Sequence, residues 1–105
     1  MAWLPFRYRD FYDVPRVMVI ERAGELYLFD SPFDAEADEY AANFDVYRLP
    51  PNVASQLDGS WDGLGEQGER IGRVPVSAIE LDPSRRSFVS DDVFNLLPTR
   101  PLAAS

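Results

Sequence analysis

The clearest pattern of hydrophobic and polar positions lies between residues 15 and 30, which read PRVMVIERAGELYLFD. Two segments of this run, 16–22 and 25–30, are rich in β-branched, aromatic and aliphatic residues, and only Ala23 and Gly24 separate them. A two-residue connection between such segments predicts a β-hairpin, although alanine is a poor first residue for a type I′ turn.

A turn at this point fixes which residues lie opposite each other. The predicted pairs are Arg22 with Glu25, Ile20 with Tyr27 and Met18 with Phe29, and on the other face Val19 with Leu28 and Val17 with Asp30. Both faces are largely apolar, whereas a half-solvated hairpin would have one polar face. We therefore expect a central hairpin, with the core on one side and a helix, a second sheet layer or a partner on the other.

The run RVPVSAIELDPSRRSFVS, residues 73–90, predicts two shorter strands joined by a turn. The first, over 74–81, is irregular, and Pro75 places it at a sheet edge or a bulge. An Asp-Pro pair begins the turn, and residues 86–90 return as the second strand. Ser90 then caps a brief helix with acidic residues in its first turn. The residues that we expect this helix to direct inward are Val93, Leu96 and Leu97.

The remaining segments carry weaker patterns. Residues 5–10 alternate aromatic and arginine residues, as in an edge strand with one wet face. Residues 34–43 begin with an aspartate cap and contain good helix formers, which predicts a short helix. Residues 44–49 alternate as a strand, and 52–57 are expected to form one helical turn. The end of the chain, 98–105, is expected to fray.

These elements together predict a mainly β fold of the α+β class, formed by one domain over residues 1–105. We expect one antiparallel, twisted sheet of about five or six strands, with a small open barrel as its most curved form, and two or three short helices.

The absence of three residue types excludes much chemistry. The 105 residues include no cysteine, no histidine and no lysine. This excludes disulfides, thiolate or imidazole metal sites, Ser-His-Asp hydrolysis, Schiff-base chemistry and P-loop phosphate binding within this chain. The first residues lack the pattern of a secretory signal, and no apolar run reaches the length of a membrane span. The expected compartment is the cytoplasm.

The formal net charge of −8 is unevenly distributed. Between residues 30 and 69 there are ten acidic residues and one basic residue, Arg48. This segment therefore carries a charge of −9, and the rest of the chain carries +1. Such a field repels nucleic acid and anionic lipid and favours basic partners. The plainer alternative is that the acidic surface serves only solubility.

One stretch, DGSWDGLGEQGE at residues 58–69, has the oxygen spacing of an EF-hand calcium loop. The liganding positions are Asp58, Ser60, Asp62, Leu64 through its backbone, Glu66 and Glu69, with Gly63 at the sharp turn. Gly65 stands where an aliphatic residue is usual, and the preceding Pro50 and Pro51 leave no room for a helix, so a helix–loop–helix hand is excluded. A lone calcium loop and a flexible acidic connection both remain open.

We expect a non-catalytic, acidic protein-binding domain, comparable in composition to small inhibitor or immunity proteins, that engages a basic partner surface. The predicted partner-binding residues are Asp34, Glu36, Asp38, Glu39, Trp61 and Asp62. Trp61 is either an exposed hot-spot residue or folded back over the sheet. No cofactor is expected unless calcium binds.

Three alternatives stay open. The 58–69 loop could hold calcium that stabilises the domain. A small carboxylate enzyme or sugar-binding module would need a concave pocket in which two carboxylates converge beside Trp61 or a tyrosine. Self-association through the 16–30 hairpin is compatible with each of these.

Overall fold

A computed structural model describes residues 2–12, 14–85 and 87–97. The predicted fraying of 98–105 falls outside these residues. The elements in chain order are β1 (Trp3–Tyr12), β2 (Val14–Arg22), β3 (Glu25–Asp30), β4 (Phe33–Asp34), β5 (Glu39–Tyr40), β6 (Asn43–Leu49), the 3-10 helix η1 (Pro51–Asp58), α1 (Leu64–Gln67), β7 (Glu69–Pro75), the 3-10 helix η2 (Val76–Ala78), β8 (Phe88–Ser90) and the 3-10 helix η3 (Asp91–Leu96).

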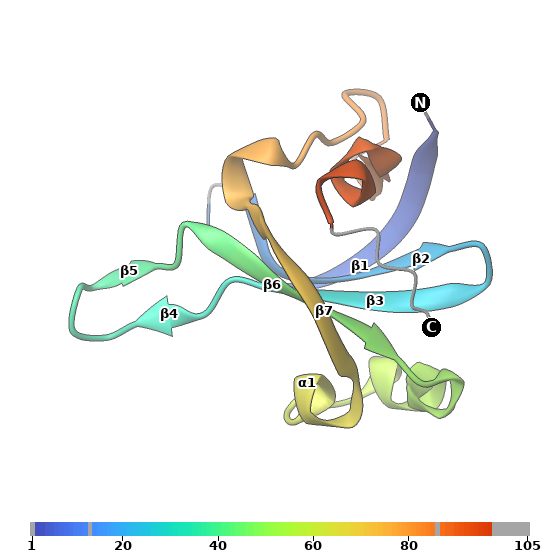
Figure 1. Cartoon of the computed structure of the whole chain (residues 1–105), viewed down its shortest axis with the longest axis horizontal. Helices are drawn as coiled ribbons and strands as arrows, with labels where there is room; N and C mark the ends of the chain where they lie inside the picture. The colour runs from blue at the N-terminus through green and yellow to red at the C-terminus, as the bar shows by residue number, and fades with distance from the viewer. Residues whose placement is uncertain (1, 13, 86, 98–105) are drawn as a thin grey trace.

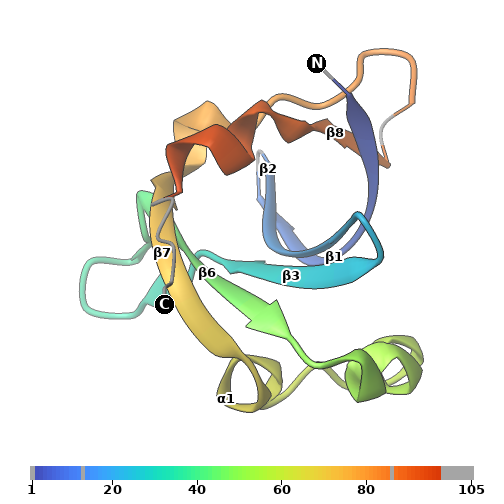
Figure 2. The ribbon, with the colours of Figure 1, turned by 45° about the vertical axis from the view of Figure 1, so that its right-hand side comes forward.

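Six strands form one antiparallel sheet in the order β7-β6-β3-β2-β1-β8 (Figure 1). The long strand β1 pairs with β2 from Phe6 onward, and its first residues, Trp3 to Pro5, pair with β8. The sheet curves strongly round one face (Figure 2), but its outer strands β7 and β8 do not pair with each other in the described residues. The predicted antiparallel sheet is therefore confirmed as a curved, open sheet that does not close into a barrel.

The β2–β3 hairpin has the predicted register, with Ile20 opposite Tyr27 and Val19 opposite Leu28. Ala23 and Gly24 have φ values of 54° and 81°, the left-handed values that a type I′ turn requires at both central positions. A left-handed φ is unfavourable for alanine. Ala23 adopts it because the paired strands on either side leave room for only two residues in the turn.

The concave face of the sheet holds the larger of two hydrophobic clusters. Its buried members are Phe6, Met18, Ile20, Phe29, Phe44, Val46, Val74, Val89, Val93 and Phe94. The helix η3 closes this side, where the ring of Phe94 lies edge-on to that of Phe29 at 5.5 Å between centroids. As predicted, Ser90 caps η3, since its Oγ accepts the backbone N–H of Asp92 at 3.1 Å. The expectation that Leu96 turns inward is wrong, because Leu96 is 53% exposed and Phe94 is buried instead.

The opposite face of the hairpin is also covered by the chain itself. Residues 51–67, which we call the outer cover, contain η1 and α1 and lie across this face. The buried members of this second cluster are Val19, Leu28, Leu49, Val53, Leu57 and Leu64. The prediction of a hairpin with two covered faces is confirmed, and a helical segment rather than a partner provides the second cover.

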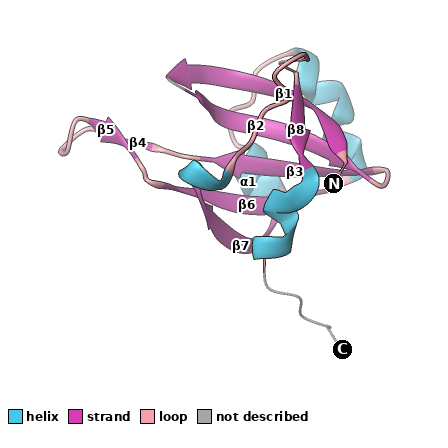
Figure 3. Ribbon diagram, turned by 90° about the horizontal axis from the view of Figure 1, so that it is seen from above, coloured by secondary structure: helices cyan, strands magenta, loops and turns pink. Residues whose placement is uncertain are grey.

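The predicted helix over residues 34–43 is wrong. The segment forms the two-stranded sheet β4–β5, which projects from the body (Figures 1 and 3). The expected aspartate cap is present, but Asp34 accepts the N–H groups of Glu36 and Ala37 within a tight turn, at 3.0 and 3.3 Å. Asp38 then takes a left-handed φ of 56°, which ends any helical path. Local capping chemistry suits a turn as well as a helix, and the sequence pattern did not distinguish them.

The strand expected over 74–81 is misplaced, because the strand in this region, β7, covers Glu69–Pro75 and shares only its last two residues with that range. The edge strand β7 ends at Pro75, η2 follows, and Leu81 forms only an isolated bridge to Val89. The helical turn expected over 52–57 is the 3-10 helix η1, and the strand expected over 44–49 is β6.

None of the helices in the described residues has the length and hydrophobicity needed to cross a membrane.

Candidate functional site

Four of the six predicted partner-binding residues lie together on the β4–β5 projection. We call residues 32–41 the acidic arm; it stands away from the six-stranded sheet (Figure 3), and none of its residues is buried. Asp34 and Glu39 belong to its two strands, and Glu36 and Asp38 to the turn between them. The arm therefore presents its carboxylates to solvent, away from the apolar clusters.

Three hydrogen bonds fix the base of the arm, one within the body, one between the body and the arm, and one across the arm itself. The buried Ser31 donates its backbone N–H to the carbonyl of Arg16 and its hydroxyl to the carbonyl of Ala41, each at 2.8 Å. The N–H of Ala41 closes the base by donating to the carbonyl of Pro32, also at 2.8 Å. These bonds fix where the arm leaves the sheet, so its carboxylates occupy a defined place.

The two strands of the arm give it an aromatic face and an acidic face. Phe33 lies opposite Tyr40 with an edge-on ring contact at 5.1 Å, and the guanidinium of Arg16 lies 5.0 Å from the Tyr40 ring centroid. Asp34 lies opposite Glu39. Because successive residues in a strand point to opposite faces, these two carboxylates share the other face, and like charges at this position repel each other.

The acids of the arm differ from those of the body in their partners. In the described residues, Glu36, Asp38 and Glu39 form no ion pair, and Asp34 accepts only the turn N–H groups. Several acids elsewhere pair with arginines, in Asp58–Arg7, Glu69–Arg48, Asp45–Arg70, Asp45–Arg73 and Asp82–Arg85. The arm thus gathers, within ten residues, four carboxylates that form no ion pair in the described part of the chain, and it carries a large share of the negative potential predicted for the middle of the chain.

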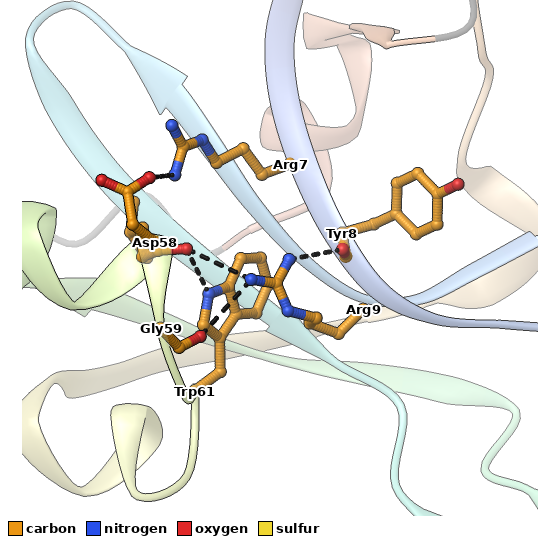
Figure 4. A network of polar contacts seen from close by, with 7 residues as sticks. Arg7, Tyr8, Arg9, Asp58, Gly59 and Trp61 are labelled. Carbon is orange, nitrogen blue, oxygen red and sulfur yellow. Dashed lines mark hydrogen bonds and ion pairs between the residues drawn. The ribbon is translucent and has the colours of Figure 1, made fainter.

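Trp61, the fifth predicted residue, lies on the outer cover and is folded back over the sheet. Its indole N–H donates to the carbonyl of Leu57 at 2.9 Å, and the guanidinium of Arg9 lies 4.4 Å from its ring centroid (Figure 4). Arg9 also donates to the carbonyls of Tyr8, Leu57 and Gly59 at 3.0, 3.2 and 3.4 Å. Of the two interpretations left open for Trp61, the structure shows the second, and Trp61 helps to fasten the cover to β1.

Asp62, the sixth predicted residue, is exposed beside Trp61 and lines an open groove on the outer side of the sheet. The groove also contains Asp10 and Asp30, which the sequence interpretation did not select. The two residues are twenty positions apart and meet only because β1, β2 and β3 pair, so local spacing gave no signal for them. Partial burial, together with the charges of Asp45 and Asp10, raises the pKa of Asp30 above its ordinary value.

The six positions of the predicted calcium loop are spread over four elements. Asp58 ends η1, Ser60 and Asp62 lie in the following turn, Leu64 and Glu66 are in α1, and Glu69 begins β7. Asp58 and Glu69 point to different arginines, Arg7 and Arg48, at 2.9 and 3.1 Å. Within the part of the chain that the structure describes, no three acidic side chains form a group that could hold a metal ion. Calcium binding by this loop stays a prediction.

Comparison of the chain with protein-family models, with curated proteins and with solved structures gave no match.

Proposed function

We propose that this protein is a non-catalytic binding domain that uses the acidic arm to hold a basic surface of another protein. The observation that carries this proposal is the cross-strand pair of Asp34 and Glu39, with Glu36 and Asp38 beside it and no cation of the described chain among them. A cationic group placed on this face would relieve the repulsion between the two carboxylates. This relief makes the binding of a cation more favourable.

The aromatic residues of the arm support the same interpretation. Phe33 is 52% exposed, although its ring is large and apolar, and Pro32, Ala35 and Tyr40 line a shallow hollow next to it. Aromatic residues surrounded by polar groups are common at the centre of protein interfaces. The arm thus combines an apolar anchor with a charged rim in ten residues.

The body of the molecule gives less support to the other mode of association. Self-association through the 16–30 hairpin was expected to use its second apolar face, but Val53, Leu57 and Leu64 of the outer cover already occupy that face. The proposed contact is therefore assigned to the arm.

The test compares three tagged forms of the protein in a native lysate of the source cell. The arm variant Glu36→Gln/Asp38→Asn/Glu39→Gln retains Asp34, whose carboxylate holds the turn, and asparagine tolerates the left-handed φ at position 38. The control variant Glu21→Gln/Glu66→Gln/Glu80→Gln removes the same charge from exposed positions outside the arm.

We expect the wild type and the control variant to recover a partner protein in stoichiometric amount. The arm variant should not recover it. Its capture should weaken as sodium chloride rises toward about 1 M, since salt screens exposed charges. Equal recovery by all three forms would overturn the assignment to the arm. A protein that remains monomeric in light scattering and recovers no partner would overturn the binding function itself.

A further inference from the structure

The groove on the outer side of the sheet has an apolar floor and an acidic rim. Val17 and Leu28 from β2 and β3 and Leu64 from α1 form its floor. Its carboxylates are Asp10, Asp30 and Asp62, which come from three different parts of the chain. This combination fits a side chain with an aliphatic stem and a positively charged end.

The one arginine in the groove does not neutralise these acids. Arg9 directs its guanidinium N–H groups to backbone carbonyls of Tyr8, Leu57 and Gly59 and stacks on Trp61 (Figure 4). In the described residues, none of the three groove carboxylates forms an ion pair. The charge of the groove is therefore complementary to a cation from outside the chain.

The groove and the base of the acidic arm are adjacent along the chain. Asp30 is the last residue of β3, and Ser31, which follows it, is the residue that anchors the arm through its bonds to Arg16 and Ala41. An extended segment lying on the arm can therefore reach the groove within a few residues, since each residue of extended chain spans about 3.3 Å.

We propose that the groove receives an arginine side chain from the same basic partner segment that the arm holds, with its stem on Val17, Leu28 and Leu64 and its guanidinium at the rim that carries Asp10, Asp30 and Asp62. Arginine is favoured over lysine because its planar fork of five donors can serve more than one carboxylate at once. The inference rests on the proposed function and adds a second, specific contact to it.

The experiment uses Trp61 as a reporter of groove occupancy. The only other tryptophan is Trp3, so a Trp3→Phe background leaves Trp61 as the single indole. The full chain in this background is titrated with acetylated, amidated hexa-arginine, and binding is followed by Trp61 fluorescence and by calorimetry. Hexa-lysine tests the preference for guanidinium, and hexa-citrulline provides an uncharged control of similar shape.

Two sets of variants separate the groove from the arm. The groove variant Asp30→Asn/Asp62→Asn should weaken hexa-arginine binding by about three- to tenfold and abolish the Trp61 response, as expected when partly exposed ion pairs are lost. The arm variant Glu36→Gln/Asp38→Asn/Glu39→Gln should weaken binding but keep a Trp61 response at saturation. The control Glu66→Gln/Glu80→Gln should leave both signals close to those of the parent. Thermal melts of each variant establish that the fold is retained.

The outcomes distinguish the two proposals. Binding that depends on the arm without any Trp61 response, or with groove variants equal to the control, overturns the groove and leaves the arm in place. Binding that is unaffected by the arm variant overturns the proposed function of the arm. An equal Trp61 response to hexa-citrulline, or a stronger response to hexa-lysine, contradicts guanidinium recognition.

Discussion

The acidic arm and the outer cover are similar in charge and opposite in structure. Each is a short connecting segment with few basic residues, and the arm and the stretch 58–69 contain four acidic residues apiece. The outer cover folds against the sheet and buries Val53, Leu57 and Leu64, whereas the arm projects and buries none of its residues. Charge therefore does not decide which segment is structural.

The difference lies in the aliphatic residues and in the arginines opposite each segment. The cover has leucine and valine at positions that meet the apolar face of β2 and β3, and burying them offsets the cost of ordering the segment. Arg7 then pairs with Asp58 of the cover, and Arg48 pairs with Glu69, which begins β7 just after the cover. The arm buries no aliphatic residue, and Arg16, the arginine that lies against it, stacks on Tyr40, while the acids of the arm form no ion pair in the described residues.

The largest expected effect is on the free energy of unfolding, which a substitution in the outer cover should lower more than a substitution in the acidic arm. Leu64 is 1% exposed, so Leu64→Ala should lower the free energy of unfolding by about 2 to 3 kcal/mol, near the lower end for buried leucines since α1 is short. Phe33→Ala on the arm should cost less than about 1 kcal/mol. Urea denaturation measures both values. Equal costs would show that the arm is as structural as the cover.

The next effect concerns the network that fastens the cover to β1. Arg9→Met keeps an aliphatic stem but removes the bonds to three carbonyls and the cation over Trp61, which should cost about 1 kcal/mol. Arg70→Met provides a matched control, because Arg70 is half-exposed and shares Asp45 with Arg73, so its loss should cost less than about 0.5 kcal/mol. A cost at Arg70 equal to that at Arg9 would contradict the role of the network.

A third effect depends on pH and concerns Asp30, between the arm and the cover. Its pKa is raised in the folded protein by burial and then by Asp45 and Asp10, so the fold retains a proton that the unfolded chain releases. Stability from this group is complete below its ordinary pKa of 3.8 and is lost as pH rises through the higher folded value. Asp30→Asn should therefore raise the melting temperature near neutral pH and give little gain at pH 3. A constant difference across this range would contradict the raised pKa.

A smaller effect concerns the repulsion within the arm. Glu39→Gln removes one of two facing carboxylates and should stabilise the fold by about 0.2 to 0.5 kcal/mol at low salt, with a smaller gain at high salt. Glu36→Gln changes the same charge in the turn, away from the cross-strand pair, and should stabilise less. If Glu39→Gln lowers the melting temperature, the two carboxylates do not repel each other as the register implies.

The β2–β3 hairpin could be predicted from the sequence, down to which residues face each other. Alternation in two adjacent segments and a two-residue turn leave one register in which apolar residues share faces, so local information was sufficient. The cover on its second face was expected, but its source in residues 51–67 was not, because that contact joins segments far apart in the chain.

The arm shows why part of the site could not be predicted. The sequence selected its acidic residues as a group, and the structure places them together, but the segment was given helical structure, since aspartate caps and good helix formers fit both a helix and a tight turn. Phe33 was not selected, because its exposure depends on how the arm leaves the sheet. Asp10 and Asp30 were missed for a related reason, as only strand pairing brings them to one groove.

The smallest expected effect concerns the calcium spacing at residues 58–69. Spacing defines a metal site only if the fold turns the oxygens toward one point, and Asp58 and Glu69 instead face Arg7 and Arg48. Millimolar calcium should therefore leave the melting temperature unchanged, because binding would first have to break both ion pairs. Magnesium at the same concentration controls for ionic strength. A rise with calcium alone that Asp58→Asn abolishes would show that the loop rearranges around the ion, and the cover rather than the arm would then hold the functional acids.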